Sequence, residues 1–470
     1  MPTIMQKRIF VSITAAAILS FSCEHTAPIE EKRGLGALNV QSYVAIGNSI
    51  TAGYQSSALY SSSQRYSYPS LIARQIGIAG GNLNFIQPLV KDPGVGGRRR
   101  ISSLSPLTIV TDTSLDATSP SVYVDGSLPP VAYHNLGIPG AYVSNPYYGE
   151  NDILDTVNSF TRSSTPFGPN NEKNLFYHLV RRNPANGLPG NPGSVWMQAK
   201  RHNPTLITVW IGNNDILIHA ASGGVAPYTE PAVFQANFNA MMDSLESTGA
   251  RILVATIPDV SAIAFMTTLQ WFVPDPGDVS KPLFGGYISL SGQMGDGSVR
   301  PLRPGDLVLL TAADYLSAGY GLPTFIPGAN GQPLPHSVVL DSAEVVRVRS
   351  ITNQYNSVIR QRAKSNVAIV DIAERFAEIA RRGLVINGVT FTTAYIRGGL
   401  FSLDGIHPTS QASGLIANMF LETMNRQWGA SIPFVDVLSL PGIPIPLSKS
   451  ATVLSALPYR RGDELRPFLQ

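Results

Sequence analysis

Four polar residues in three separate stretches are of the types that acyl transfer requires. Ser49 follows a short apolar run, and Asn214 follows a second one. Asp404 and His407 lie three residues apart in a third stretch, so one turn of chain can carry both side chains. A serine nucleophile, a histidine base, a carboxylate that orients the histidine and an amide donor are the groups that acyl transfer uses. Together the three stretches predict a site for that chemistry.

Each stretch also has an ordinary structural explanation. Glycines flank Ser49 and permit a tight bend, but a serine in such a turn is common as a turn or N-cap residue. His407 by itself fits a capping or core histidine, and Asn214 with Asp215 fits the N-cap of a following helix. The combination of the stretches, rather than any single one, favours a hydrolase.

The apolar runs around these residues predict strands of a parallel sheet. Four runs are short and apolar, and segments with helical signals separate them. This alternation favours a parallel sheet with helices on both faces. The predicted strands are Tyr43–Ile46, Leu206–Ile211, Arg251–Ile257 and Val367–Ile372, the predicted helices are 69–77, 151–160, 171–182, 229–245, 341–364, 373–382 and 408–427, and a hairpin is expected at Leu384–Phe391. The apolar face of the helix at 229–245 predicts core packing.

Composition limits the classes of function. The 470-residue chain is 44% hydrophobic and 14% charged, with 42 Gly and 36 Pro, which predicts a large core decorated by long ordered loops. Insertions are expected at about 80–130 and 262–340. A net charge of +3 is too small to indicate a nucleic-acid partner, and the basic run Arg98–Arg100 is typical of a solvated loop.

The N-terminus has the pattern of an export signal. Lys7 and Arg8 precede the apolar stretch Ile9–Phe21, which is 13 residues long. A stretch of this length is too short to span a bilayer and matches the apolar core of a signal peptide. The pattern therefore predicts an exported protein.

The single cysteine of the chain, Cys23, comes directly after this stretch. Its position resembles the lipidation site of bacterial lipoproteins, although Ser20 stands where those signals prefer Leu. We expect a signal peptide at 1–23, a tether at 24–38 and a lipid anchor at Cys23, which predicts a cell-envelope protein held at the outer membrane. An ordinary secretory signal, and thus a secreted or periplasmic protein, is the alternative.

Taken in chain order, four motifs resemble the conserved blocks of the GDSL, or SGNH, hydrolase family. They are Gly47-Asn48-Ser49-Ile50, Asn135 through Gly140, Gly212-Asn213-Asn214-Asp215, and Asp404-Gly405-Ile406-His407-Pro408. The resemblance implies a flavodoxin-like three-layer α/β/α fold with a parallel central sheet and long loop insertions. It implies a hydrolase domain over residues 39–428, followed by a C-terminal tail at 429–470.

The same resemblance implies a role for each site residue. Ser49 is expected to be the nucleophile, His407 the general base and acid, and Asp404 the group that orients the histidine. The oxyanion hole is expected to use the backbone N–H groups of Ser49 and Gly140 and the side-chain amide of Asn214. The sequence departs from the family at Asn48, where an Asp is usual and supports the loop.

No metal or other cofactor is expected. The chain has no HExxH motif, and no GxSxG motif of ordinary α/β hydrolases. The histidines other than His407 have no partner at a metal-ligand spacing.

The expected activity is hydrolysis of carboxylic esters by a serine esterase or lipase. The aromatic-rich insertion at 262–340 suggests an apolar lid, and hence a lipid or other acyl ester as the substrate. A carbohydrate O-deacetylase of the same family is an alternative, since the Gly- and Tyr-rich stretch Ala141–Gly149 suits a sugar equally well. A non-catalytic envelope lipoprotein is the third hypothesis. The expected partners are therefore an ester substrate and, through Cys23, a membrane.

Overall fold

The computed structural model describes residues 33–104, 107–117, 119–124, 133–143, 176, 179–180, 195–275 and 278–444. The predicted signal peptide, Cys23 and the predicted helix at 151–160 lie outside these residues, as do most of the predicted helix at 171–182 and the end of the C-terminal tail. Within the described ranges, no helix combines the length and the apolar composition that crossing a bilayer requires.

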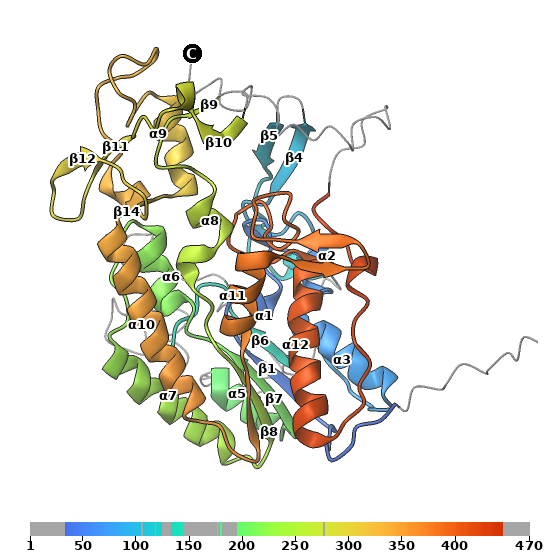
Figure 1. Cartoon of the computed structure of the whole chain (residues 1–470). Coiled ribbons are helices and arrows are strands. Elements are labelled where there is room, and N and C mark those ends of the chain that lie inside the picture. The colour runs from blue at the N-terminus through green and yellow to red at the C-terminus, as the bar shows by residue number, and fades with distance from the viewer. Residues whose placement is uncertain are drawn as a thin grey trace, which may run out of the picture. The chain divides into compact units, whose positions relative to one another are not determined.

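A parallel sheet of five strands forms the centre of the fold (Figure 1). Its strand order is β15-β8-β7-β1-β6, and every neighbouring pair is parallel. The four predicted strands are confirmed, and a fifth strand joins them at the edge next to β1. The bounds are β1 (Tyr43–Gly47), β6 (Asn135–Gly137), β7 (Leu206–Trp210), β8 (Arg251–Ala255) and β15 (Val367–Val370).

The strand order reverses at β1. The next strand of this sheet along the chain, β6, lies on one side of β1, and the following one, β7, lies on the other. Gly47 pairs with Gly137 of β6 and with Trp210 of β7, so the three strands end at the same level. In open α/β sheets, the crevice beyond the carboxyl ends of the strands at such a reversal is where ligands bind.

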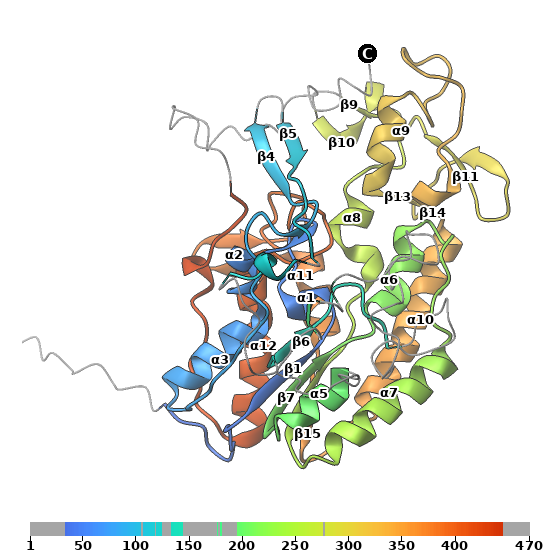
Figure 2. The same ribbon diagram turned by 180° about the vertical axis from the view of Figure 1, so that it is seen from behind.

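Side chains of the strands alternate between two apolar cores. Tyr43 and Ala45 pack with helices α3 (Tyr68–Ile78) and α12 (Ser410–Trp428). Val44 and Ile46 pack on the opposite face. That face is covered by α5 (Val195–Arg201), α7 (Pro231–Glu246) and α10 (Ser342–Arg360), as Figure 2 shows from behind. The expected three-layer α/β/α arrangement is therefore confirmed.

Local signals in the sequence account for several of these elements. The predicted apolar face of α7 is buried throughout, in Phe234, Phe238, Met241, Met242 and Leu245. Asp341 and Glu344 form the predicted capping box at the start of α10. The hairpin of β16 (Leu384–Ile386) and β17 (Val389–Phe391) turns at Asn387 and Gly388, which both have positive φ. The remaining helices α6 (Asn214–Ala221) and α11 (Ile372–Arg382) flank the site described below.

Both expected insertions contain short elements of their own. Residues 80–130 include β3 (Val95–Gly96), β4 (Arg99–Leu104) and β5 (Leu107–Thr111). Residues 262–340 have a separate apolar core around Val273, Leu302 and Leu334. Their elements are α8 (Ala264–Thr267), β9 (Pro274–Asp275), β10 (Asp278–Pro282), β11 (Ser291–Gln293), β12 (Val299–Pro301), β13 (Leu307–Val308), α9 (Ala313–Ser317) and β14 (Val339–Leu340).

The ends of the described chain pack against each other at α12. The N–H of Ala37 donates to the carbonyl of Trp428 (2.9 Å), and Gly34 pairs with Ser431. Asn425 holds the backbone of Ile432 through both its oxygen and its nitrogen, each at 2.9 Å. We call these contacts of residues 33–38 with 428–432 the terminal contact. They extend the folded domain beyond the expected limits of 39–428, into the predicted tether and tail.

Candidate active site

Ser49 stands at the exit of β1, on the first turn of the four-residue helix α1 (Ser49–Ala52). The side-chain oxygen of Asn48 caps this helix by accepting the N–H of Ile50 (3.2 Å). The side-chain nitrogen of Asn48 donates to the amide oxygen of Asn213 (3.2 Å). The asparagine thus links the first and third motifs, and an aspartate, which has no donor, could keep this link only by accepting from the side-chain nitrogen of Asn213.

The backbone of β6 packs closely against the backbone of α1. A Cβ atom on Gly137 would lie 2.7 Å from the carbonyl carbon of Thr51, closer than real Cβ contacts allow. The side-chain nitrogen of Asn135 donates to the carbonyl oxygen of Thr51 (2.9 Å), and its oxygen accepts the N–H of Gly137 (3.0 Å). The second motif therefore supports the helix that carries Ser49.

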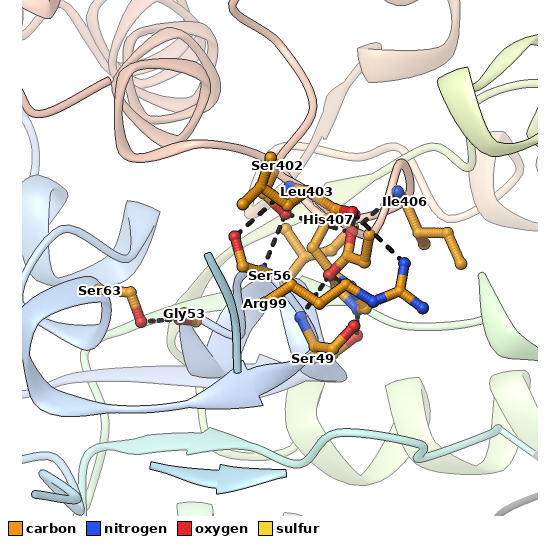
Figure 3. A network of polar contacts seen from close by, with 12 residues as sticks. Ser49, Gly53, Ser56, Ser63, Arg99, Ser402, Leu403, Ile406 and His407 are labelled. Atoms are coloured by element: carbon orange, nitrogen blue, oxygen red, sulfur yellow. Dashed lines mark hydrogen bonds and ion pairs between the residues drawn. The ribbon is translucent and has the colours of Figure 1, made fainter. Parts of the chain in front are cut away.

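A chain of hydrogen bonds joins the three residues expected to perform the chemistry, of which Figure 3 labels Ser49 and His407. The Oγ of Ser49 lies 2.8 Å from Nε2 of His407, and Nδ1 of His407 lies 3.0 Å from Oδ2 of Asp404. The side chains of Asp404 and His407 are 6% and 14% exposed. The loop that carries both residues is closed by the bond from the N–H of Ser402 to the carbonyl of His407 (2.8 Å).

Asp404 is held as a carboxylate by its surroundings. Burial alone raises the pKa of this carboxyl, but the adjacent His407 and the backbone N–H groups of Ile406 and His407 outweigh burial and hold its pKa well below the usual range. The carboxylate also accepts the N–H of Ser57 (2.8 Å) and the hydroxyl of Ser402 (3.1 Å). With its second oxygen on Nδ1, the carboxylate favours the tautomer of His407 that leaves Nε2 free to accept a proton.

The turn that contacts Asp404 has an uncommon backbone. Ser56 and Ser57 have φ angles of 52° and 67°, values that non-glycine residues rarely adopt. The N–H of Ser56 donates to Oγ of Ser402 (2.9 Å), so both serines attach to the loop of Asp404. Such strained positions concentrate at functional sites.

Tyr54 covers one side of the histidine. Its ring centroid lies 4.7 Å from that of His407, and its N–H donates to the carbonyl oxygen of Ser49 (3.0 Å). Burial, together with the nearby Asp404, raises the pKa of the Tyr54 phenol well above its usual range, so this group stays neutral. Sequence reasoning missed Tyr54, Ser57 and Ser402, because no short-range pattern ties them to the motifs.

The third motif attaches to the loop after β6. The side-chain nitrogen of Asn214 donates to the carbonyl of Ala141 (2.8 Å), and Asp215 accepts the N–H of Val143 (2.9 Å). Gly140 precedes these residues with a φ of 80°. The side chains of Asn214 and Asp215 thus bind the 141–143 loop, whereas the residue before α6 is Asn213, which makes no capping bond with its side chain.

An apolar pocket opens beside Ser49 and His407. Asn213 and Asn214 also line it, and the remainder of its wall comes mainly from α11, α12 and the loop before α12. We call it the acyl pocket. Its apolar lining residues are Ile50, Trp210, Leu217, Pro258, Val260, Ile263, Ile372, Phe376, Ile379, Leu400, Phe401, Ile406, Pro408, Ala412, Leu415, Ile416 and Met419. Of the insertion expected at 262–340, Ile263 is the one residue among these lining residues, so the insertion that suggested an apolar lid contributes little to the wall of the pocket.

A protein-family comparison places these motifs in one family. The family model described as GDSL-like Lipase/Acylhydrolase matches residues 43–420, a range that includes Ser49, Asn214, Asp404 and His407. The chain belongs to this family. As a GDSL-like acylhydrolase, it is an enzyme that hydrolyses ester bonds. Among curated proteins, no sequence match was found.

Two solved structures align with this acylhydrolase. The Clostridium thermocellum family 3 carbohydrate esterase is 12% identical, with a TM-score of 0.31, and the alignment covers 83% of this chain and 98% of that one. The α/β hydrolase enzyme LAE5 from the metagenome of Lake Arreo, Spain, is 11% identical, with a TM-score of 0.34 and coverages of 83% and 97%.

Among the residues that the structure describes, no three His, Cys, Asp or Glu side chains are grouped so that they could hold a metal ion.

The contact between β6 and α1 leads to a first prediction. Gly137→Ala places a methyl group against the backbone of Thr51 and Ala52, which must move. We expect a loss of about 1–3 kcal/mol in the free energy of unfolding. Esterase activity should also fall at temperatures where the variant stays folded, because α1 carries Ser49. Gly77→Ala in α3 is the matched control, since its Cβ meets nothing within 4 Å. Equal denaturation midpoints for the two variants would contradict the close approach.

Proposed function

We propose that this acylhydrolase is a serine carboxylesterase with Ser49 as nucleophile, His407 as general base and Asp404 as the orienting carboxylate. The observation that carries the proposal is the unbroken chain from Ser49 Oγ to His407 Nε2 (2.8 Å) and from His407 Nδ1 to Asp404 (3.0 Å). Nucleophile and base lie within the reach that proton transfer needs.

The reaction runs in two halves. Ser49 Oγ bonds to the acyl carbon while its proton passes to Nε2 of His407, and the imidazolium that forms is stabilised by Asp404. His407 then returns the proton to the departing alcohol as the bond between the acyl carbon and that alcohol breaks. Water next attacks the acyl-enzyme with His407 again as base, which releases the acid and restores Ser49.

The tetrahedral intermediates need donors for their oxyanion. The candidates are the backbone N–H groups of Ser49 and Gly140 and the side-chain amide of Asn214. As the first residue of a helix, Ser49 has an N–H without a partner in that helix. Asn214 uses one N–H on the carbonyl of Ala141, which orients the amide and leaves its second N–H for the substrate. Asn214 also lines the acyl pocket together with Ser49.

The acyl pocket favours an apolar acyl group. Its wall beyond the catalytic residues is almost entirely aliphatic and aromatic, and each buried CH₂ of a ligand contributes about 0.8 kcal/mol. An acetyl group would use little of this surface. The pocket therefore supports a lipid or other acyl ester over an acetylated carbohydrate. Anchoring through Cys23 stays a prediction from the sequence.

The role of the nucleophile is tested by Ser49→Ala. We expect the hydrolysis of 4-nitrophenyl butyrate to fall by about 10⁴–10⁶, the usual effect of losing a triad serine, and the labelling by a fluorophosphonate probe to disappear. Ser247→Ala, an exposed serine after α7, serves as the control and should retain both. A wild-type protein that is folded but not labelled would support a non-catalytic protein instead.

The two neighbouring asparagines separate an oxyanion donor from a structural link. Asn214→Ala should lower kcat by about 10²–10³ with little change in KM, because the amide meets full negative charge only in the intermediate. Asn213→Ala removes the acceptor for Asn48 and should cost less than about tenfold. The reverse order of effects would assign the donor to Asn213.

The acyl pocket is tested by substrate chain length. For 4-nitrophenyl esters, we expect kcat/KM to rise from acetate to octanoate. Ile416→Trp, which fills part of the pocket, should shift the preference towards acetate by about tenfold or more, whereas Gln427→Trp at the exposed end of the same helix should not. A wild-type enzyme that prefers the acetate ester would favour the deacetylase.

A further inference from the structure

The basic run Arg98–Arg100 lies beside the catalytic loop and not in a separate solvated loop. Arg99 is the first residue of β4, and its Nη1 donates to the carbonyl oxygen of Leu403 (3.4 Å), the residue before Asp404. Figure 3 shows the Arg99 side chain among the catalytic residues with this bond drawn. The expectation from the sequence was wrong because the run lies about 300 residues away from the loop that it contacts.

The three arginines differ in how their charges are paired. Arg98 lies 3.3 Å from Asp92, and Arg100 lies 2.8 Å from Asp112. In the described part of the chain, no carboxylate forms an ion pair with Arg99. Arg99 is half-buried, and its guanidinium has five N–H donors. The Leu403 carbonyl and the Tyr395 hydroxyl each engage one of them, so more than half of these donors remain for a ligand.

A second pocket surrounds this guanidinium. Ser56, Tyr60 and Leu403 line it with the three arginines, together with Ile101 and Pro444. We call it the arginine pocket. Leu403 belongs to the same loop whose residues Leu400, Phe401, Ile406 and His407 line the acyl pocket. The loop of Asp404 and His407 therefore borders an apolar pocket and a basic pocket.

Tyr54 connects the surroundings of Arg99 with the ring of His407. His407 delivers a proton to the departing alcohol, so that alcohol must contact its ring. Tyr54 lies against the same ring at 4.7 Å, and the charges of both Arg99 and Asp404 act on its phenol. The hydroxyl of Tyr395 donates to the carbonyl of Leu403 (2.7 Å), which Arg99 also contacts. Tyr54 thus contacts the ring that the alcohol must approach, and its phenol lies in the field of Arg99.

We propose that Arg99 recognises an anionic group, a phosphate or a carboxylate, on the alcohol portion of the ester. The preferred substrate class is then an amphiphilic ester, with an apolar acyl chain in the acyl pocket and an anion in the arginine pocket. Guanidinium binds both anions through paired N–H donors. This inference rests on the proposed esterase function.

Two esters that differ only in the anion test the proposal. They are 1-hexanoylglycerol 3-phosphate and 1-hexanoylglycerol, and the measured quantity is the ratio of their kcat/KM values at low ionic strength. Wild type should give a ratio of about tenfold or more, as expected for a hydrogen bond to a charged group. The ratio should fall with added salt, because a half-buried charge is partly screened.

Variants assign the preference to one residue. Arg99→Gln should bring the ratio close to one, and Arg99→Lys should restore part of it because the charge remains. Arg201→Gln, which removes the same charge from the exposed end of α5 and outside both pockets, should leave the ratio as in wild type. A structural role of Arg99 would change both esters equally and leave the ratio unmoved. Hexanoyl glycerate, the carboxylate analogue, shows which anion is the better ligand.

The outcomes separate the inference from the function on which it rests. A wild-type ratio of one or below overturns the anion site, and this measurement needs no variant. An Arg99→Gln ratio equal to that of wild type overturns the assignment to Arg99. Absence of hydrolysis of all three esters, together with absence of fluorophosphonate labelling, overturns the esterase itself.

Discussion

The site depends on one buried carboxylate, that of Asp404. It accepts hydrogen bonds from the turn at Ser57, from its own loop at Ser402, Ile406 and His407, and from the imidazole. A buried charge is tolerated only when such donors replace its hydration. The same bonds that keep Asp404 ionised therefore join the N-terminal and C-terminal parts of the domain and set the orientation of His407.

The strand ends bring the motifs within reach of this carboxylate. Glycine at positions 47 and 137 lets β1, β6 and α1 approach closely, as the contacts of a Cβ at either position show. The order reversal at β1 then presents Ser49 between the loops after β6 and β7. The sheet contributes no reacting group, yet its geometry decides which loops can cooperate. The loop of Asp404 and His407 in turn borders both an apolar and a basic pocket.

Much of this arrangement could be predicted from the sequence, because its signals are local. Apolar runs predicted four of the five central strands, and short polar motifs predicted Ser49, Asp404, His407 and Asn214. The missing parts depend on contacts between distant residues. Ser57 bonds to a residue 347 positions away, and nothing near Arg99 in sequence indicates its contact with Leu403. The aromatic insertion was expected to be an apolar lid, whereas the wall of the acyl pocket comes mainly from apolar side chains of α11, α12 and the loop before α12.

The terminal contact has a mechanical consequence. Tyr43, the first residue of β1, follows the contact by only a few residues, and β1 leads directly to Ser49. A pulling force on the chain before Arg33 meets the bonds of Gly34 and Ala37 to Ser431 and Trp428 first. The load then passes into α12 at its C-terminal end. The N-terminal end of this helix lies just after His407, but the helix is packed against β15 and α3. Strand β1 is thereby shielded from tension, and the catalytic geometry is insulated from movement of whatever precedes the domain.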